Sequence, residues 1–269
     1  MRFGICVFKD DIPAAERAGY DYVELTVTNV FPEVDEKEYG KLKEQLKHSA
    51  IKPETWRRFI PSHLPVVGPE IDSEAIGEFL KITLGRIRDL GGRIVVFGSP
   101  LSRNIPEGFS KKRAHEQLVQ FLQVSGDIAK SNDLIIAIEM IVRRNCNVLN
   151  TVSEVGFLAR EIERPEVKVL ADLYHMSGND EPPEAVEQIG DYLCHVHMPV
   201  PEIVGLNEPR AINDILPEYP IKEFLRSLKK ISYHNRISIE DLDRKFMNVE
   251  REAPVVLSYV KNMWDNFSE

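Results

Sequence analysis

The stretch LIIAIE at residues 134–139 is an apolar run of strand length that ends in a carboxylate, and related runs follow further along the chain. They read VKVLAD at 167–172, LCHVHM at 193–198 and ISIE at 237–240. Short apolar runs of this kind are typical of strands buried in a parallel sheet. Four earlier runs, at 3–8, 22–26, 53–59 and 94–98, bring the number of predicted strands to eight.

Longer amphipathic stretches separate these strands and predict helices. The clearest covers 111–131, where Leu118, Phe121 and Leu122 recur at helical spacing. The expected helices are 12–18, 35–49, 73–90, 111–131, 151–162, 184–189, 221–231 and 253–264. Dividing 269 residues among eight strand–helix units gives about 34 residues per unit, the size of the repeat in a closed parallel barrel. No Gly-rich phosphate loop follows the first strand, as a dinucleotide-binding sheet would require. We therefore predict an α/β fold, a single (β/α)8 barrel domain covering 1–269.

The composition excludes several classes of protein. With 34 Lys and Arg against 43 Asp and Glu, the formal net charge of -9 argues against nucleic acid as the main partner. The three cysteines, Cys6, Cys146 and Cys194, form no C-x-x-C pair, which favours a reducing compartment. No signal-peptide core and no run long enough to span a membrane is found in the sequence. We expect a cytoplasmic protein without membrane partners.

Four late strands carry a metal-compatible side chain at their carboxyl ends. These residues are Glu139, Asp172, His197 and Glu240. In a barrel the strand ends converge on the axis, so three carboxylates there would repel one another unless a divalent cation collected them. Such hard donors suit Mn²⁺ or Mg²⁺, with Zn²⁺ or Co²⁺ also possible. The competing interpretation treats each residue as an isolated polar cap of its strand.

The segments around these residues resemble a known family. IE at 138–139, ADLYHM at 171–176, HVH at 195–197 and SIE at 238–240 are similar to the metal-site motifs of the xylose isomerase-like TIM-barrel superfamily, most of all to its D-tagatose 3-epimerase and sugar-phosphate isomerase/epimerase group. The resemblance implies that the four strand-end residues bind one divalent ion, often Mn²⁺, and that His175 lies beside the substrate. Asn145 stands where a further Glu is usual, and the segment after His197 departs from the family pattern, so the substrate is not carried over.

The chemistry expected of such a site is proton transfer next to a ketone. A ketose or keto-sugar acid bound to the metal would have its neighbouring C–H acidified. Glu139 and Glu240 would act as the catalytic pair from opposite sides of that carbon, one removing the proton and the other returning it through an enediolate. His175 would donate a hydrogen bond to a substrate oxygen.

Arginines follow several predicted strands and suggest that the substrate carries an anionic group. They are Arg57, Arg58, Arg103, Arg143, Arg144 and Arg210. Guanidinium groups suit carboxylates or phosphates, although surface ion pairs explain loop arginines equally well. From these we take Arg57, Arg143 and Arg210 as substrate-binding candidates. Trp56 and His63 are expected to form the wall and lid of the substrate pocket.

Three alternatives to an epimerase or isomerase of small carbohydrates stay open. A metal-dependent dehydratase or lyase acting on an oxidised sugar or inosose would use the same enediolate. An endonuclease IV-like site is disfavoured because no His follows the fourth strand and no Asp-x-His follows His197. A barrel that binds sugar without turnover is the third. A homo-oligomer is expected.

Overall fold

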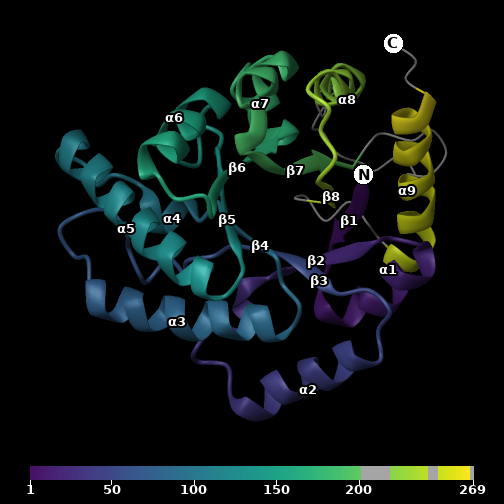
Figure 1. The fold of residues 1–269 in the computed structure, drawn as a ribbon, viewed down its shortest axis with the longest axis horizontal. Coiled ribbons are helices and arrows are strands. Elements are labelled where there is room, and N and C mark those ends of the chain that lie inside the picture. The colour runs from purple at the N-terminus through teal and green to yellow at the C-terminus, as the bar shows by residue number, and fades with distance from the viewer. Residues whose placement is uncertain (201–218, 242–247, 267–269) are drawn as a thin grey trace.

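The computed structural model describes residues 1–200, 219–241 and 248–266, and it shows a closed barrel of eight parallel strands with helices around the outside (Figure 1). Neighbouring strands pair in sequence order, and β8 closes the barrel by pairing with β1. The strands are β1 (Arg2–Cys6), β2 (Tyr22–Thr26), β3 (Pro53–Arg57), β4 (Ile94–Phe97), β5 (Ile135–Glu139), β6 (Val167–Asp172), β7 (Leu193–Pro199) and β8 (Arg236–Glu240). The prediction of a (β/α)8 barrel is therefore confirmed.

Helices connect successive strands and cover the outer face of the barrel. The α-helices are α1 (Ile12–Ala18), α2 (Glu36–Lys47), α3 (Ser73–Asp89), α4 (Pro100–Arg103), α5 (Lys111–Ser131), α6 (Val152–Ile162), α7 (Leu173–Gly178), α8 (Ile221–Lys230) and α9 (Val249–Asn266). The 3-10 helices are η1 (Lys9–Asp11), η2 (Val27–Asn29), η3 (Pro183–Gln188) and η4 (Gly190–Tyr192).

The structure departs from the sequence-based elements at several places. The helix expected at 184–189 is the 3-10 helix η3, and α4 and α7 were not predicted because each is shorter than two helical turns. The helix expected from 253 begins four residues earlier, with Pro254 inside it. Its first turns are stabilised by tertiary contacts with α1 and the residues after it: Arg17 Nε donates to Glu250 at 2.8 Å, and Tyr20 Oη donates to the Ala253 carbonyl at 3.1 Å.

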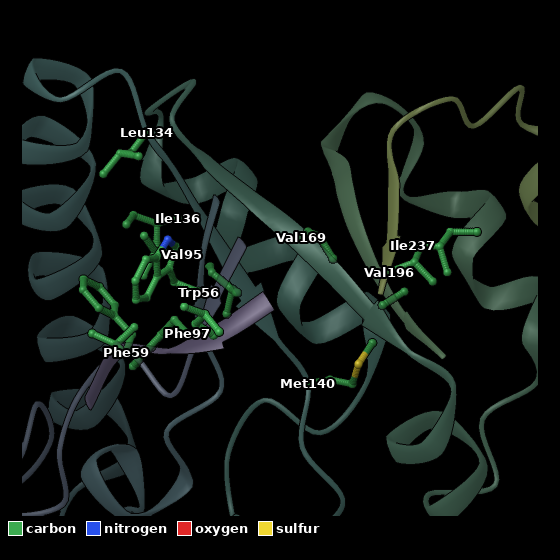
Figure 2. Close-up of a cluster of buried hydrophobic side chains, with 14 of the residues drawn as sticks. Trp56, Phe59, Val95, Phe97, Leu134, Ile136, Met140, Val169, Val196 and Ile237 are labelled. Atoms are coloured by element: carbon green, nitrogen blue, oxygen red, sulfur yellow. The ribbon is translucent and has the colours of Figure 1, made fainter. Parts of the chain in front are cut away.

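The main hydrophobic core lies between the barrel and its helices rather than at the barrel mouth (Figure 2). Trp56 belongs to this core and is fully buried, with its indole N–H donating to the Pro53 carbonyl at 2.8 Å. Its neighbours on β3, Thr55 and Arg57, contact residues inside the barrel instead. Side chains alternate between the two faces of a strand, so the barrel interior is left to polar groups at this point. No helix in the described ranges is long and apolar enough to cross a membrane.

Candidate metal centre

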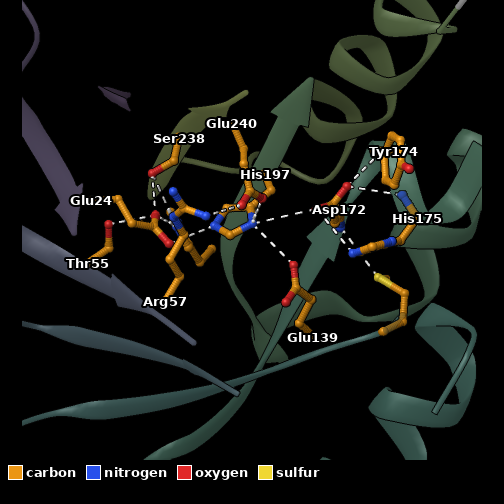
Figure 3. Close-up of polar contacts among 12 residues, drawn as sticks. Glu24, Thr55, Arg57, Glu139, Asp172, Tyr174, His175, His197, Ser238 and Glu240 are labelled. Carbon is orange, nitrogen blue, oxygen red and sulfur yellow. Dashed lines mark hydrogen bonds and ion pairs between the residues drawn. The ribbon is translucent and has the colours of Figure 1, made fainter. Parts of the chain in front are cut away.

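The four strand-end residues meet inside the mouth of the barrel. Glu139, Asp172, His197 and Glu240 each bring one donor atom to within 4.8 Å of the others. His197 Nδ1 lies 2.9 Å from Glu240 Oε2, 3.2 Å from Glu139 Oε1 and 3.6 Å from Asp172 Oδ2. All four side chains are buried, and Figure 3 shows the three carboxylates gathered on the Nδ1 side of the His197 ring. The interpretation as isolated strand caps does not describe this arrangement, because the four groups form one cluster.

Asp172 is held in place by the helix that follows it. It is the N-cap of α7, and its Oδ1 accepts hydrogen bonds from the backbone N–H groups of Tyr174 at 2.7 Å and His175 at 3.1 Å. Two orphan donors of the helix are thereby satisfied by a single carboxylate oxygen. The other oxygen, Oδ2, is the one that faces His197. The local structure therefore fixes which oxygen of Asp172 is offered to the site.

Glu139 is positioned by the end of the neighbouring strand. A Cβ at Gly98, directly after β4, would lie 2.1 Å from Glu139 Oε2, so only glycine leaves room for the carboxylate. Arg103 on α4 is fully buried and donates to the carbonyls of Phe97 at 2.9 Å and Glu139 at 2.7 Å. Arg103 therefore ties the ends of β4 and β5 together, and it is not the substrate-facing arginine that the sequence suggested.

The electrostatics of the cluster favour a bound cation. Burial raises the pKa of Glu139 above its usual value, and the hydrogen bond from His197 opposes this only in part. Burial alone would lower the pKa of His197, but the carboxylates of Glu24 and Glu240 outweigh it and raise the pKa well above the usual value. The three carboxylates thus concentrate negative potential in front of His197 Nδ1. A divalent ion would bind at that position, between the imidazole and the carboxylates.

The donor set fits a divalent metal. Three carboxylates and one imidazole supply hard oxygen and nitrogen ligands, the chemistry that Mn²⁺ and related ions accept. His197 also has the partner that a metal-bound imidazole needs, because its Nε2 lies 2.9 Å from Glu24 Oε1. With one proton held on Nε2, Nδ1 is the nitrogen that would bind a metal ion placed among the three carboxylates. The residues present therefore suit a single divalent ion of this class.

We expect about one divalent ion per chain in protein purified without chelator, because three carboxylates share one buried site and His197 and Arg57 offset their charge only in part. Elemental analysis measures the stoichiometry before and after Mn²⁺ addition. The variant Glu161→Gln, which alters a half-exposed partner of His115, should keep the same stoichiometry. Less than about 0.2 ion per chain after Mn²⁺ addition, or three zinc ions per chain, would contradict a single-metal centre.

A cavity of about 550 Å³ opens beside the centre, between the carboxyl ends of β1 to β3, α1 and the start of α9. Arg57 connects the two, because it lines the cavity and its Nη1 donates to Glu240 Oε1 at 3.1 Å. The cavity has the size of a small-molecule pocket. Its charged lining contains Asp10, Asp11, Asp241 and Glu250 against Arg17, Arg57 and Arg58. Among the described lining residues, the acidic groups outnumber the basic ones.

His175 lies next to the four-residue cluster. Its side chain is buried on α7, and its Nε2 lies 4.0 Å from Asp172 Oδ2. The backbone N–H of Val142 donates to His175 Nδ1 at 3.4 Å, so the neutral ring carries its proton on Nε2, the nitrogen nearer the cluster. A donor at Nε2 is what a hydrogen bond to a substrate oxygen requires.

The other residues suggested for substrate binding are not gathered at the centre. Trp56 is placed in the outer core because the alternation along β3 turns it away from the mouth. His63 is mostly exposed, with Nε2 3.8 Å from Glu33 Oε1. The side chain of Arg143 is on the exposed surface, and Arg210 lies outside the described residues.

The sequence analysis did not single out Glu24. It is fully buried on β2 and accepts from both histidines of the HVH segment, His195 and His197, at 2.9 Å. One acidic residue inside the otherwise apolar run YVELT was the available signal. Such a residue in a buried strand requires a partner, but the partner lies more than 170 residues away along the chain.

A closed (β/α)8 barrel with a buried carboxylate and histidine cluster at the carboxyl ends of its strands defines the class of protein. The family model described as xylose isomerase-like TIM barrel matches residues 12–262, so the chain belongs to that family. No curated protein sequence matches the chain significantly.

Solved structures with the same fold include several sugar epimerases. A D-psicose 3-epimerase with D-tagatose from Clostridium cellulolyticum H10 is similar with a TM-score of 0.80 and 19% identity, over 98% of this chain and 99% of that one. The 3-keto-D-glucoside 4-epimerase YcjR from E. coli has a TM-score of 0.75 and 16% identity, over 97% and 99%. An IolI protein with a binding zinc atom has a TM-score of 0.74 and 19% identity, over the full length of both chains.

Proposed function

We propose that this protein is a divalent-metal-dependent epimerase or isomerase of a ketose or keto-sugar. The observation that carries the proposal is the convergence of two carboxylates, Glu139 and Glu240, on Nδ1 of His197 within one four-ligand cluster (Figure 3). A divalent ion held there would polarise a substrate carbonyl and acidify the adjacent C–H. The sugar epimerases among the similar folds support this class of reaction.

The two carboxylates have different surroundings, which suits an acid–base pair. Glu139 has a raised pKa because it is buried, so its carboxylate accepts a proton more readily than an exposed Glu does. Glu240 is oriented by Arg57, which donates to its Oε1 and leaves Oε2 toward His197. Proton removal by one carboxylate and return by the other would invert a stereocentre through an enediolate, while His175 donates from Nε2 to a substrate oxygen.

The cavity beside the centre favours an uncharged sugar over an anionic one. Of the five considered arginines that lie in the described residues, Arg57 and Arg58 line it, and Arg57 already pairs with Glu240. Asp10, Asp11 and Asp241 on the same walls would repel a phosphate or carboxylate. Carboxylates and guanidinium groups together offer acceptors and donors for the hydroxyl groups of a sugar.

We expect neutral ketoses to be processed at least about tenfold better, in kcat/KM, than the corresponding phosphates or uronates. The measurement is NMR in D₂O with a panel of ketoses, their phosphates and uronates. Deuterium incorporation without loss of water indicates epimerisation or isomerisation. A dehydrated product would identify the lyase alternative. A preference for anionic sugars that is lost in Arg58→Ala would contradict this expectation and show that the cavity binds an anionic group.

A further inference from the structure

Beside the four-ligand cluster, the barrel interior contains a second group of polar side chains centred on Glu24 (Figure 3). Glu24 is fully buried, and both of its carboxylate oxygens are hydrogen-bonded. Oε2 accepts from Thr55 Oγ1 at 2.8 Å and from Ser238 Oγ at 2.7 Å, and it lies 2.9 Å from His195 Nε2. Oε1 lies 2.9 Å from His197 Nε2.

The two oxygens of Glu24 have separate tasks. The contacts at Oε2 hold the carboxylate in place, and they extend to Tyr22, whose hydroxyl lies 3.0 Å from Ser238 Oγ. Gly4 makes room for the Tyr22 ring, because a Cβ there would lie 2.2 Å from it. The contact at Oε1 is the one that reaches the cluster, since His197 points its other nitrogen at the three carboxylates.

We infer that Glu24 is the positioning residue of the metal centre: its Oε1 keeps the proton of His197 on Nε2 and thereby presents Nδ1 as the ligand. The inference rests on the proposed metal-dependent function. A buried carboxylate costs free energy unless it is paired, and Glu24 is paired through a histidine that itself belongs to the cluster. A carboxylate hydrogen-bonded to the second ring nitrogen fixes the tautomer and the ring orientation of a metal-binding histidine.

The variant Glu24→Gln separates this role from simple packing, because the two side chains have nearly the same shape. The hydroxyl donors Thr55 and Ser238 require an acceptor at the Oε2 position, so the amide oxygen of the glutamine is drawn there. Its NH₂ group then faces His197 Nε2, which must accept instead of donate. The proton moves to Nδ1 and occupies the place of the metal.

The experiment is a calorimetric titration of the full-length protein with Mn²⁺ alone, without a sugar. We expect Glu24→Gln to bind Mn²⁺ about 10–100-fold more weakly than the wild-type protein. The matched controls Thr55→Val and Ser238→Ala each remove one hydrogen bond to Oε2 and leave the Oε1 contact with His197. They should stay within about threefold of wild type, with circular dichroism confirming that every variant is folded.

Two results would overturn the inference. One is a Glu24→Gln protein whose Mn²⁺ affinity lies within threefold of wild type, and the other is an equal loss of affinity in both controls, which would show a general structural role.

A second experiment uses the wild-type protein and does not depend on the folding of a variant. In its Zn²⁺-loaded form, NMR of ¹⁵N-histidine should show the metal-bound ring with a downfield Nε2–H, as a carboxylate partner produces; an ordinary position would also count against Glu24. Binding of Mn²⁺ without any sugar turnover would refute the proposed function and leave the role of Glu24 intact.

Discussion

Replacing Glu139 or Glu240 with glutamine is expected to reduce turnover of the identified sugar by at least about 100-fold, the lower end of what a positioned acid or base contributes. An amide has the shape of the carboxylate and keeps an oxygen for the metal, but it cannot take up a proton. Binding of Mn²⁺ should therefore weaken only in part. Both quantities are measured on the same preparations, turnover by NMR and metal affinity by calorimetry.

The matched control for these variants is Glu161→Gln, which makes the same chemical change on α6, at a half-exposed side chain paired with His115. It should leave turnover unchanged. Solvent exchange gives a sharper test than product formation, because a single remaining base can still exchange the substrate C–H in D₂O. If either variant epimerises at a rate near wild type, the two-carboxylate mechanism is wrong.

The second large effect concerns stability. Replacing Arg103 with methionine is expected to lower the free energy of unfolding by about 2–4 kcal/mol, because the carbonyls of Phe97 and Glu139 lose charge-assisted hydrogen bonds in a fully buried position. For a chain of this size the melting temperature should fall by roughly 5–10 °C. Differential scanning calorimetry measures the change.

The control Arg58→Ala removes an exposed guanidinium on the cavity wall and should change the melting temperature by no more than about 2 °C. The comparison separates the two explanations of Arg103. If Arg103 bound the substrate, its replacement would raise KM and leave thermal stability unaffected. Unchanged melting of Arg103→Met would therefore contradict the role of Arg103 as a tie between β4 and β5.

Much of the architecture could be read from periodicity alone. The alternation of short apolar runs with amphipathic stretches predicts the eight strands, because burial on both faces requires continuous apolar residues. The four candidate ligands follow from the same pattern, since parallel strands bring their carboxyl ends to one place. For example, Asp172 and His197 could be assigned to one site from their positions at the ends of two predicted strands, and the structure pairs them across β6 and β7.

Short helices and the orientation of individual side chains could not be predicted from periodicity. The helix α7 has too few residues for a periodic signal, and it forms because Asp172 caps it while also serving the cluster. Trp56 and Arg103 are adjacent to plausible site positions in the sequence, yet one faces the outer core and the other is buried between strand ends. A single residue of register decides such orientations.

The sequence by itself therefore determined the barrel and the four groups at its mouth, because local periodicity and strand direction carry that information. The tertiary structure alone decided what surrounds those groups. Glu24, Thr55 and Ser238 lie on three different strands, and their contacts with one another span up to 214 residues of chain. Closure of the barrel between β8 and β1 brings these strands around a common interior, and no local pattern records which buried polar side chains will meet there.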